Sequence, residues 1–259
     1  MLVVKWLVWI LRLFQRSVQP GDLIALRRSG ADGKTGTLGC VVTIGGTRYA
    51  LTCDHALPSA AHGDRVAHYR PPMVTGPAGT STAGKFARVI GEFYNLPTLA
   101  SVDCALVRVW FHARVKSKHP EPIGWVDPEV YPTDKLVIRP RTQLDGRIPV
   151  QFCGGVTKPV SKGAASLGAW APLLYGSGGQ VLGVAPPFIE IKSEMDPALD
   201  VCDDGDSGSL VVTAFDAERP RPIGVLVAQK PDAIAAFGLA VPFQRVLDAI
   251  GQRARLDAR

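Results

Sequence analysis

The sequence predicts an all-β fold of many short strands, with one helix near the C-terminus. Short apolar runs recur along the chain and are separated by turn-forming segments. The chain contains 27 Gly and 21 Pro residues, which are common in turns. Such spacing is typical of strands joined by turns. The sequence shows neither the strand and helix alternation of an α/β protein nor an internal repeat of about 20 to 50 residues. A chain of 259 residues can hold one large domain or two smaller ones.

Two strands of the first half form a predicted hairpin that ends at a histidine. The apolar run 39–44 is followed by Gly45-Gly46 and then by the run 48–52. A Gly-Gly pair between two such runs predicts a tight hairpin turn. Because the second run continues into Cys53, Asp54 and His55, we expect His55 where a strand ends.

The other strands of the first half are predicted at residues 22–26, 86–93 and 102–111. Asp103 lies near the start of the last of these runs. The stretch 58–84 is rich in Gly, Pro, Ala and Thr, which predicts a long surface loop or loosely ordered hairpins.

The second half follows a connection marked by prolines at 120, 122 and 128. Its strands are predicted at residues 135–138, 148–152, 180–184, 188–191, 210–213, 223–228 and 237–241. Apolar residues then recur at helical spacing at Phe243, Val246, Leu247 and Ile250. This spacing predicts an amphipathic helix that packs on the second half.

The N-terminal residues 2–14 form a separate apolar segment, interrupted only by Lys5 and Arg12. The segment is too short to span a bilayer, and Arg12 and the lack of a small-residue cleavage site argue against a signal peptide. On a helix the basic residues would share one narrow face, and Trp6 and Trp9 would help cover the rest. Such a segment needs an apolar partner: a membrane interface, another subunit, or a groove on its own domain.

The five cysteines predict reduced thiols, because they are odd in number and contain no CxxC pair. They are Cys40, Cys53, Cys104, Cys153 and Cys202. We therefore expect a cytoplasmic protein, with membrane association as an alternative through residues 2–14. The formal net charge of +6 favours acidic partners, but the basic residues are scattered and no nucleic-acid-binding motif accompanies them. We predict no nucleic-acid partner.

Three residues supply the chemistry of peptide hydrolysis. Ser207, in Gly205-Asp206-Ser207-Gly208, offers a nucleophilic hydroxyl. His55 offers the one side-chain type that ordinarily titrates near neutral pH, and Asp103 can fix its tautomer. Their order along the chain is His, Asp, Ser, which differs from the orders of subtilisins and α/β-hydrolases. Ser209 also departs from the Gly-x-Ser-x-Gly motif of the hydrolases.

These segments resemble those of the trypsin- and chymotrypsin-like serine peptidases. Residues 203–212 (DDGDSGSLVV) resemble the nucleophile loop and the strand after it, and residues 51–55 (LTCDH) resemble the histidine strand. Residues 102–107 (VDCALV) resemble the aspartate segment, and residues 238–242 (GLAVP) resemble the last strand. The resemblance covers roughly residues 35 to 251. Asp203 stands where secreted relatives often have a half-cystine, which implies a disulfide-poor, bacterial-type branch.

The family's fold is a double six-stranded antiparallel β-barrel with a C-terminal helix. Applied to this chain, the resemblance implies an N-terminal apolar helical segment at 1–20 and a first barrel with His55 and Asp103 at 21–119. The second barrel, with Ser207 and the C-terminal helix, would occupy 120–259.

The resemblance also implies a serine endopeptidase that forms an acyl-enzyme on Ser207, with His55 as general base and acid. The backbone N–H groups of Gly205 and Ser207 would form the oxyanion hole, and Asp206 would support the loop. Asp54 is a rival orienting acid. We prefer Asp103, because neighbouring residues on a strand point to opposite faces.

The substrate would be a protein or peptide. By resemblance Val201 would form the base of the specificity pocket, and its lining would include Cys202, Asp204, Val227, Gln229 and Gly238. Because no acidic residue occupies the base, a small or medium apolar side chain is expected rather than Lys or Arg.

No cofactor or metal is expected. The remaining histidines, His62, His68, His112 and His119, lack metal-ligand spacing. The run 176–179 lacks the Lys-Ser/Thr ending of a phosphate loop and predicts a hairpin turn. A second hypothesis is a catalytically idle binding or scaffold protein of the same fold that acts through its N-terminal apolar segment.

Overall fold

A computed structural model gives the fold of the chain. It describes residues 17–27, 34–70, 74–75, 80–81, 85–138, 146–157, 161–168, 174–175, 181–182, 188–193, 201–215, 219–230, 237–251 and 253–257. The predicted apolar segment 2–14, the run 176–179 and most of the stretch 71–84 lie outside the described residues. None of the helices in the described part has the length and apolar character that crossing a membrane requires.

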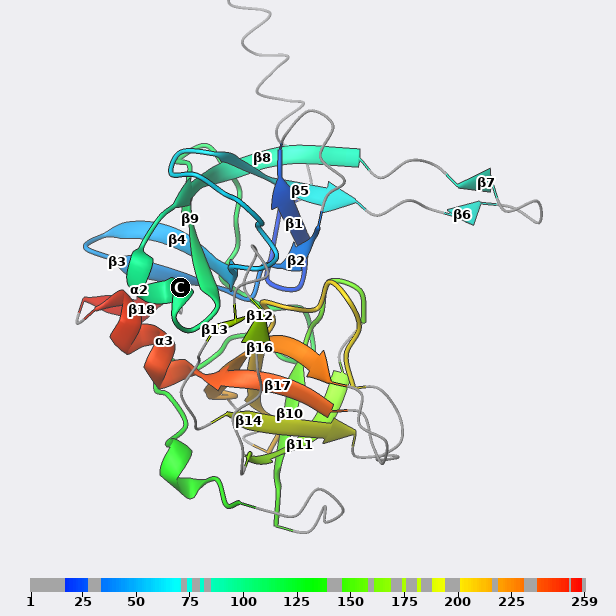
Figure 1. Cartoon of the computed structure of the whole chain (residues 1–259), viewed down its shortest axis with the longest axis vertical. Coiled ribbons are helices and arrows are strands. Elements are labelled where there is room, and N and C mark those ends of the chain that lie inside the picture. The colour runs from blue at the N-terminus through cyan, green and yellow to red at the C-terminus, as the bar shows by residue number, and fades with distance from the viewer. Residues whose placement is uncertain are drawn as a thin grey trace, which may run out of the picture.

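The first half forms one curved antiparallel sheet (Figure 1). Its strands are β1 (Leu23–Leu26), β2 (Gly36–Thr37), β3 (Cys40–Ile44), β4 (Thr47–Cys53), β5 (Arg65–Arg70), β8 (Lys85–Tyr94), β9 (Cys104–Val109) and β18 (Ala254–Leu256), in the order β18-β3-β4-β9-β8-β5-β1-β2. The residues between β2 and β3 link distant parts of this sheet. Leu38 N–H donates to the Asp22 carbonyl beside β1, and Gly39 N–H donates to the Leu51 carbonyl in β4, both at 2.9 Å. The sheet therefore curls back on itself.

The second half forms a closed six-stranded barrel. Around it run β10 (Ile148–Phe152), β11 (Ser161–Leu167), β14 (Ile189–Ser193), β17 (Phe237–Pro242), β16 (Pro222–Lys230) and β15 (Leu210–Thr213). Two small hairpins, β6 (Val74–Thr75) with β7 (Thr80–Ser81) and β12 (Leu174–Tyr175) with β13 (Val181–Leu182), stand apart from the two sheets. The predicted all-β fold in two halves is thus confirmed. The second half is the expected closed six-stranded barrel, and the first half is a curled eight-stranded sheet in place of a closed six-stranded one.

Three clusters of buried side chains hold this arrangement together. One fills the curled sheet around Ile24, Val66 and Ile90, and another fills the second barrel around Phe152 and Ile191. The third cluster joins the halves, because it contains residues of β3, β4 and β9 together with residues of β15, β16 and β17. All five cysteines are buried, as small apolar side chains would be, and none of them forms a disulfide with another.

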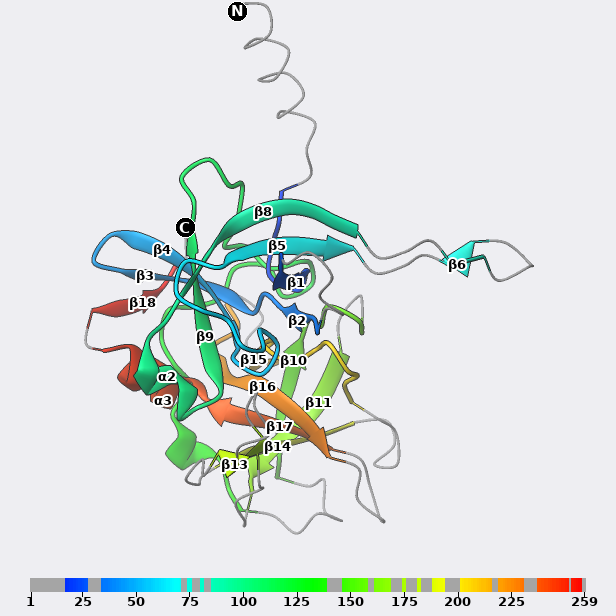
Figure 2. The ribbon, with the colours of Figure 1, turned by 45° about the horizontal axis from the view of Figure 1, so that its top comes forward.

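The C-terminal part of the chain returns to the first half (Figures 1 and 2). The predicted helix is present as α3 (Phe243–Ile250), which buries Phe243 and Val246. It contacts β16 and β17 and also the short helix α2 (Pro97–Ala100). Strand β18 then pairs with β3 in the first sheet, although the domain boundary proposed from sequence assigns residues 120–259 to the second barrel. That boundary stays a prediction.

Several strand predictions need correction. The stretch 58–84 was predicted as loop or loose hairpins, but it contains β5, which pairs with β1 and β8 and buries Val66 and Ala67. The predicted strand 135–138 is instead a short 3-10 helix, η1 (Thr133–Lys135), followed by an isolated bridge at Ile138. Of the predicted strand 180–184, the structure describes only residues 181–182, which form β13 (Val181–Leu182). Strands β11 and β18 were not predicted.

Candidate active site

His55 and Asp103 are brought together by the pairing of β4 with β9. Cys53, the last residue of β4, lies opposite Cys104, the first residue of β9. His55 therefore follows one strand just where Asp103 precedes its neighbour. Asp103 has a φ of +51°, a left-handed conformation that Asp adopts more readily than most residues, and this turns the chain from the end of α2 into β9.

The carboxylate of Asp103 holds His55 at two points. Its Oδ2 lies 2.6 Å from His55 Nδ1, and its Oδ1 accepts the His55 backbone N–H at 3.1 Å. Asp103 is buried, while the His55 side chain is 25% exposed. A carboxylate bound at Nδ1 favours the tautomer that carries its proton there, so Nε2 is left free to accept a proton.

Asp54 makes no comparable contact among the described residues. Its backbone N–H donates to the Asp103 carbonyl at 3.2 Å, but its carboxyl group forms no hydrogen bond with His55. Burial, with the charge of Asp103 second, raises the pKa of Asp54 above its ordinary value. The geometry therefore favours Asp103 over Asp54 as the group that orients the imidazole.

Cys53, His55 and Asp103 offer ligand atoms that all lie within 4.8 Å of one another. Such a set could in principle hold a metal ion. However, burial raises the pKa of the Cys53 thiol well above its ordinary value, and its Sγ donates to the Leu226 carbonyl at 3.1 Å. A protonated thiol that already donates is a poor metal ligand, so the group fits a base and its orienter better than a metal centre.

The loop that carries Ser207 is held by the buried carboxylate of Asp206. Its Oδ1 accepts the backbone N–H groups of Val156 at 2.9 Å and Thr157 at 3.1 Å. Its Oδ2 accepts the Thr157 hydroxyl at 2.6 Å and the Asp203 N–H at 2.9 Å. Four donors thus fix a carboxylate with no exposed surface, and the backbone on either side of it is fixed as well.

The residues flanking Asp206 leave two backbone donors free. Gly205 has a φ of +103°, a conformation that strongly favours glycine. Within the described part of the chain, neither Gly205 N–H nor Ser207 N–H donates to another protein group. Two unpaired amides separated by one residue can bind an oxyanion.

Hydrogen bonds from Thr37 connect this loop to the first sheet. Its N–H donates to the Ser207 carbonyl and its hydroxyl donates to the Gly205 carbonyl, each at 2.8 Å. The same hydroxyl accepts the Gly155 N–H at 2.8 Å. Gly208, with a φ of +100°, lies so close to the Thr37 carbonyl and the Thr52 hydroxyl that a side chain there would collide with them. The two halves therefore meet directly at the loop that carries Ser207.

The hydroxyl of Ser207 lies in this junction. It donates to the Val227 carbonyl of β16 at 3.4 Å, and among the described residues it makes no hydrogen bond with His55. The neighbouring Leu226 carbonyl accepts a hydrogen bond from the thiol of Cys53, which lies two residues before His55. Ser207 thus lies near the histidine strand with a long, weak hydrogen bond that a change of side-chain rotamer would break.

The structure brings together some of the residues that are expected around a specificity pocket. Val201 and Cys202 are 5% and 2% exposed, and both lie against Gly238. Val227 is buried beside Ser207, whereas Asp204 is exposed near the loop. The side chain of Gln229 lies outside what the structure describes.

Sequence reasoning missed Thr37 and Thr157 as supports of the loop. Both are isolated threonines, at sequence separations of 168 and 49 residues from the groups that their hydroxyls bind. No local motif marks them, and only the fold brings them to the loop.

Comparison with known proteins identifies the fold. No protein-family profile matches the sequence, and comparison with characterised protein sequences finds no match. Among solved structures, Thermobifida fusca Protease A is 14% identical to this chain, with a TM-score of 0.55. Cellulomonas bogoriensis chymotrypsin is 17% identical, with a TM-score of 0.52. Each of these two alignments covers 94% of this chain and 100% of the other chain. A glutamic acid specific serine protease is 18% identical with a TM-score of 0.50, over 93% of this chain and all of the other. The chain therefore has the fold of the bacterial trypsin- and chymotrypsin-like serine proteases.

Proposed function

We propose that this protein of the chymotrypsin-like fold is a serine endopeptidase, with Ser207 as nucleophile, His55 as base and Asp103 as orienter. One observation carries the proposal: the 2.6 Å contact between His55 and Asp103 lies beside a loop that presents a serine and two unpaired backbone amides. Each group that acyl transfer requires is therefore present within one junction.

The reaction would proceed in two halves. Ser207 Oγ attacks the carbonyl carbon of the scissile peptide bond while His55 Nε2 takes its proton. Negative charge on the carbonyl oxygen is stabilised by the N–H groups of Gly205 and Ser207. His55 then returns the proton to the leaving amine, which leaves an acyl group on Ser207. Water, activated by the same imidazole, hydrolyses this ester and regenerates the hydroxyl.

The substrate is a protein or peptide with a small or medium apolar side chain before the cleaved bond. Val201, Cys202 and Gly238 lie together at the expected base of the pocket, and none of these three residues is acidic. A cationic side chain would lose its hydration there without gaining a partner.

The test is hydrolysis and covalent labelling of purified protein by a fluorophosphonate, which reacts with activated serines. Ser207→Ala should abolish labelling and lower kcat by roughly 10⁴-fold or more. Ser101→Ala is a matched control, because Ser101 is an exposed serine of the first half. If Ser207→Ala labels as strongly as the wild-type protein, the proposal is wrong.

One observation favours the alternative of an idle binding or scaffold protein. The Ser207 hydroxyl donates to Val227 rather than to His55. Catalytic hydrogen bonds are often loose without substrate, so this arrangement is compatible with an enzyme. An idle protein would fail to label even when folded and incubated with excess probe, whereas an enzyme would label through Ser207.

A further inference from the structure

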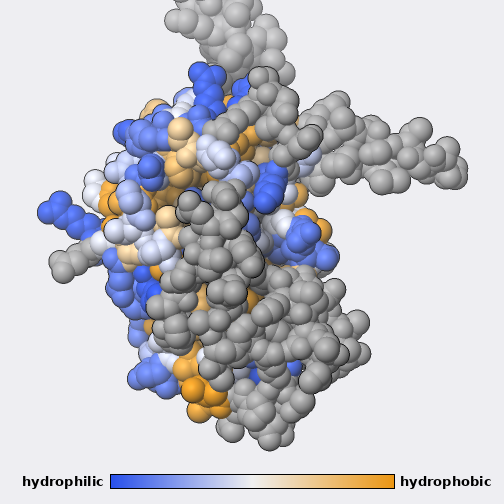
Figure 3. Space-filling model, viewed as in Figure 1, coloured by the Kyte–Doolittle hydropathy of each residue, from blue (hydrophilic) through white to orange (hydrophobic). Residues whose placement is uncertain are grey.

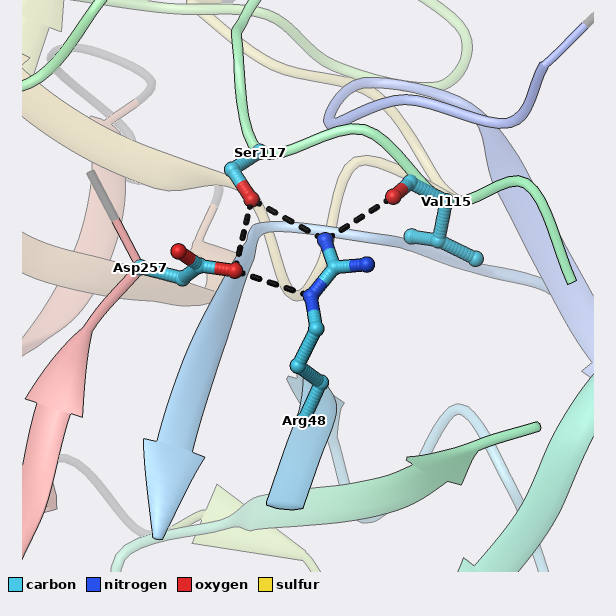
Figure 4. Close-up of polar contacts among 4 residues, drawn as sticks. All are labelled: Arg48, Val115, Ser117 and Asp257. Carbon is cyan, nitrogen blue, oxygen red and sulfur yellow. Dashed lines mark hydrogen bonds and ion pairs between the residues drawn. The ribbon is translucent and has the colours of Figure 1, made fainter. Parts of the chain in front are cut away.

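Strand β4, which leads into His55, is held at its start by hydrogen bonds of Arg48. Arg48 Nη2 donates to the Val115 carbonyl at 2.9 Å and to Ser117 Oγ at 3.1 Å (Figure 4). Its Nε pairs with the Asp257 carboxylate at 2.8 Å. The turn between β3 and β4 is exposed, and Figure 3 shows mainly hydrophilic residues along that edge of the molecule. Arg48 therefore attaches the outer end of β4 to its neighbours in the first half and to the end of the chain.

The other end of β4 is attached to the second half by a thiol. Cys53, the last residue of the strand, has no exposed surface, and its Sγ donates to the Leu226 carbonyl of β16 at 3.1 Å. The same carbonyl accepts the Gly208 N–H at 2.7 Å. Because Gly208 directly follows Ser207, one carbonyl joins the strand that leads into His55 to the loop that carries Ser207.

Strand β16 is irregular at this carbonyl. Its register with β17 shifts between Leu226 and Ala228. The Val227 carbonyl, which accepts the Ser207 hydroxyl at 3.4 Å, lies within the shift. A bulge locally disrupts the ladder of backbone hydrogen bonds, so the position of this part of β16 depends on other contacts. The Cys53 thiol supplies such a contact from the first half.

Two other cysteines share the surroundings of Cys53 but not its hydrogen bond. Cys40 and Cys104 belong to the same buried cluster, and Cys104 faces Cys53 across the two strands. Burial raises the pKa of all three thiols, so each stays protonated at neutral pH. Within the part of the chain that the structure describes, neither the Cys40 nor the Cys104 thiol has a hydrogen-bond acceptor. Burial alone therefore does not account for the contact of Cys53.

We propose that Cys53 is a positioning residue, whose thiol sets the place of His55 relative to Ser207 by bonding the Leu226 carbonyl. The inference rests on the proposed function, in which His55 must take the proton of the Ser207 hydroxyl. That hydroxyl donates to Val227 in the structure, so a small displacement between β4 and β16 changes whether the two groups can meet. Cys53 takes no part in the reaction itself and acts only through the two segments that it joins.

The experiment is steady-state hydrolysis of a chromogenic peptide with Ala before the cleaved bond. Cys53→Ala removes the donor and should lower kcat about tenfold with little change in KM, because the lost alignment acts on the chemical step. Cys53→Ser keeps a donor and should recover most of the rate. Cys53→Val fills the site without a donor, so it gives the same comparison if the alanine variant does not fold.

Cys40→Ala is the matched control, because it removes a thiol without an acceptor among the described residues of the same cluster. It should leave kcat within about twofold of the wild-type value. Urea denaturation adds a readout that needs no activity. Cys53→Ser should be more stable than Cys53→Ala, whereas Cys40→Ser should be less stable than Cys40→Ala, because it buries a hydroxyl without an acceptor.

Arg48→Gln is the control at the other end of β4. It breaks the hydrogen bonds to Val115, Ser117 and Asp257, so it should lower stability. Because these bonds join β4 only to the first half and to the end of the chain, kcat should stay close to the wild-type value.

The outcomes separate this role from packing and from the proposed function. A fall in kcat in Cys53→Ala that Cys53→Ser reverses, without a fall in Cys40→Ala, supports the positioning role. Wild-type kcat in Cys53→Ala, or equal losses in the two alanine variants, overturns it and leaves the peptidase proposal intact. A wild-type protein that neither hydrolyses peptides nor labels with fluorophosphonate overturns both.

Discussion

The two halves of the candidate site are held in different ways. In the first half, one carboxylate, that of Asp103, meets the His55 ring at a single 2.6 Å contact. In the second half, the Ser207 loop is held by six hydrogen bonds: four donated to Asp206 and two donated by Thr37. The orientation of the proposed base His55 thus depends on one residue, whereas the Ser207 loop is supported by several.

Single substitutions in the two halves should therefore have different effects. Removing the one partner of the base changes its tautomer directly, so the loss falls on the chemical step. Removing one of several supports of a loop leaves the others in place, so the loss is smaller and is divided between stability and rate.

The largest expected effect is that of Asp103→Asn, with a fall in kcat of roughly 10⁴-fold, because an amide favours the wrong imidazole tautomer. Asn also tolerates the left-handed φ of this position, so the fold should persist. Steady-state kinetics and circular dichroism measure the two effects. Asp54→Asn is the control and should cost about fivefold or less, because its carboxyl group does not bond His55. Equal losses in the two variants would contradict the assignment of Asp103.

Asp206→Asn, in the second half of the site, should reduce activity less than Asp103→Asn. We expect kcat to fall roughly 10²- to 10³-fold. An amide can still accept from Val156 and Thr157, but its NH₂ group would face the Thr157 hydroxyl and the Asp203 N–H. Leaving a buried donor unpaired should also lower the free energy of unfolding by about 1–3 kcal/mol. Urea denaturation and kinetics of the same sample test both effects. A variant with wild-type kcat would show that the loop does not need this carboxylate.

Thr37→Val should have a smaller effect, roughly 10- to 100-fold in kcat with little change in KM. The substitution keeps the shape but removes the hydroxyl that donates to Gly205 and accepts from Gly155. An oxyanion hole acts on the transition state, so its misplacement lowers kcat rather than substrate binding. Thr37→Ser restores the hydroxyl and should recover most of the rate. A purely structural role would lower stability in Thr37→Val and leave kcat unchanged.

The smallest effect concerns only the dependence of stability on pH. Burial lowers the pKa of His119 from its ordinary value of 6.5 to about 3. Below pH 6.5 the unfolded chain therefore binds a proton that the folded protein does not, and stability falls as pH falls. Between pH 7 and pH 5 this should cost about 2 kcal/mol of unfolding free energy. Urea denaturation at both pH values should show a smaller difference in His119→Gln, whereas the exposed His112→Gln should behave like wild type.

The strands with clear apolar patterns were predictable from sequence, and those that depend on neighbours were not. Apolar runs bounded by glycines or by the His55 and Ser207 motifs form β3, β4, β15 and β17. β11, with the sequence SKGAASL, has small residues and little pattern, and it is a strand because β10 and β14 pair with it on both sides. β18 is only three residues long and exists through its pairing with β3. Tertiary pairing thus overrides weak local preference.

The identity and order of the proposed catalytic residues could be predicted from sequence alone, because each lies in a short motif at the end or start of a strand. His55 follows an apolar strand, Asp103 precedes one, and Ser207 lies in a turn before one. The folded structure was needed to show that Asp103 rather than Asp54 bonds His55 and that Thr37 supports the Ser207 loop. These features join residues that are distant in sequence. Local sequence patterns cannot predict such contacts, because they do not show which distant groups the folded chain brings together.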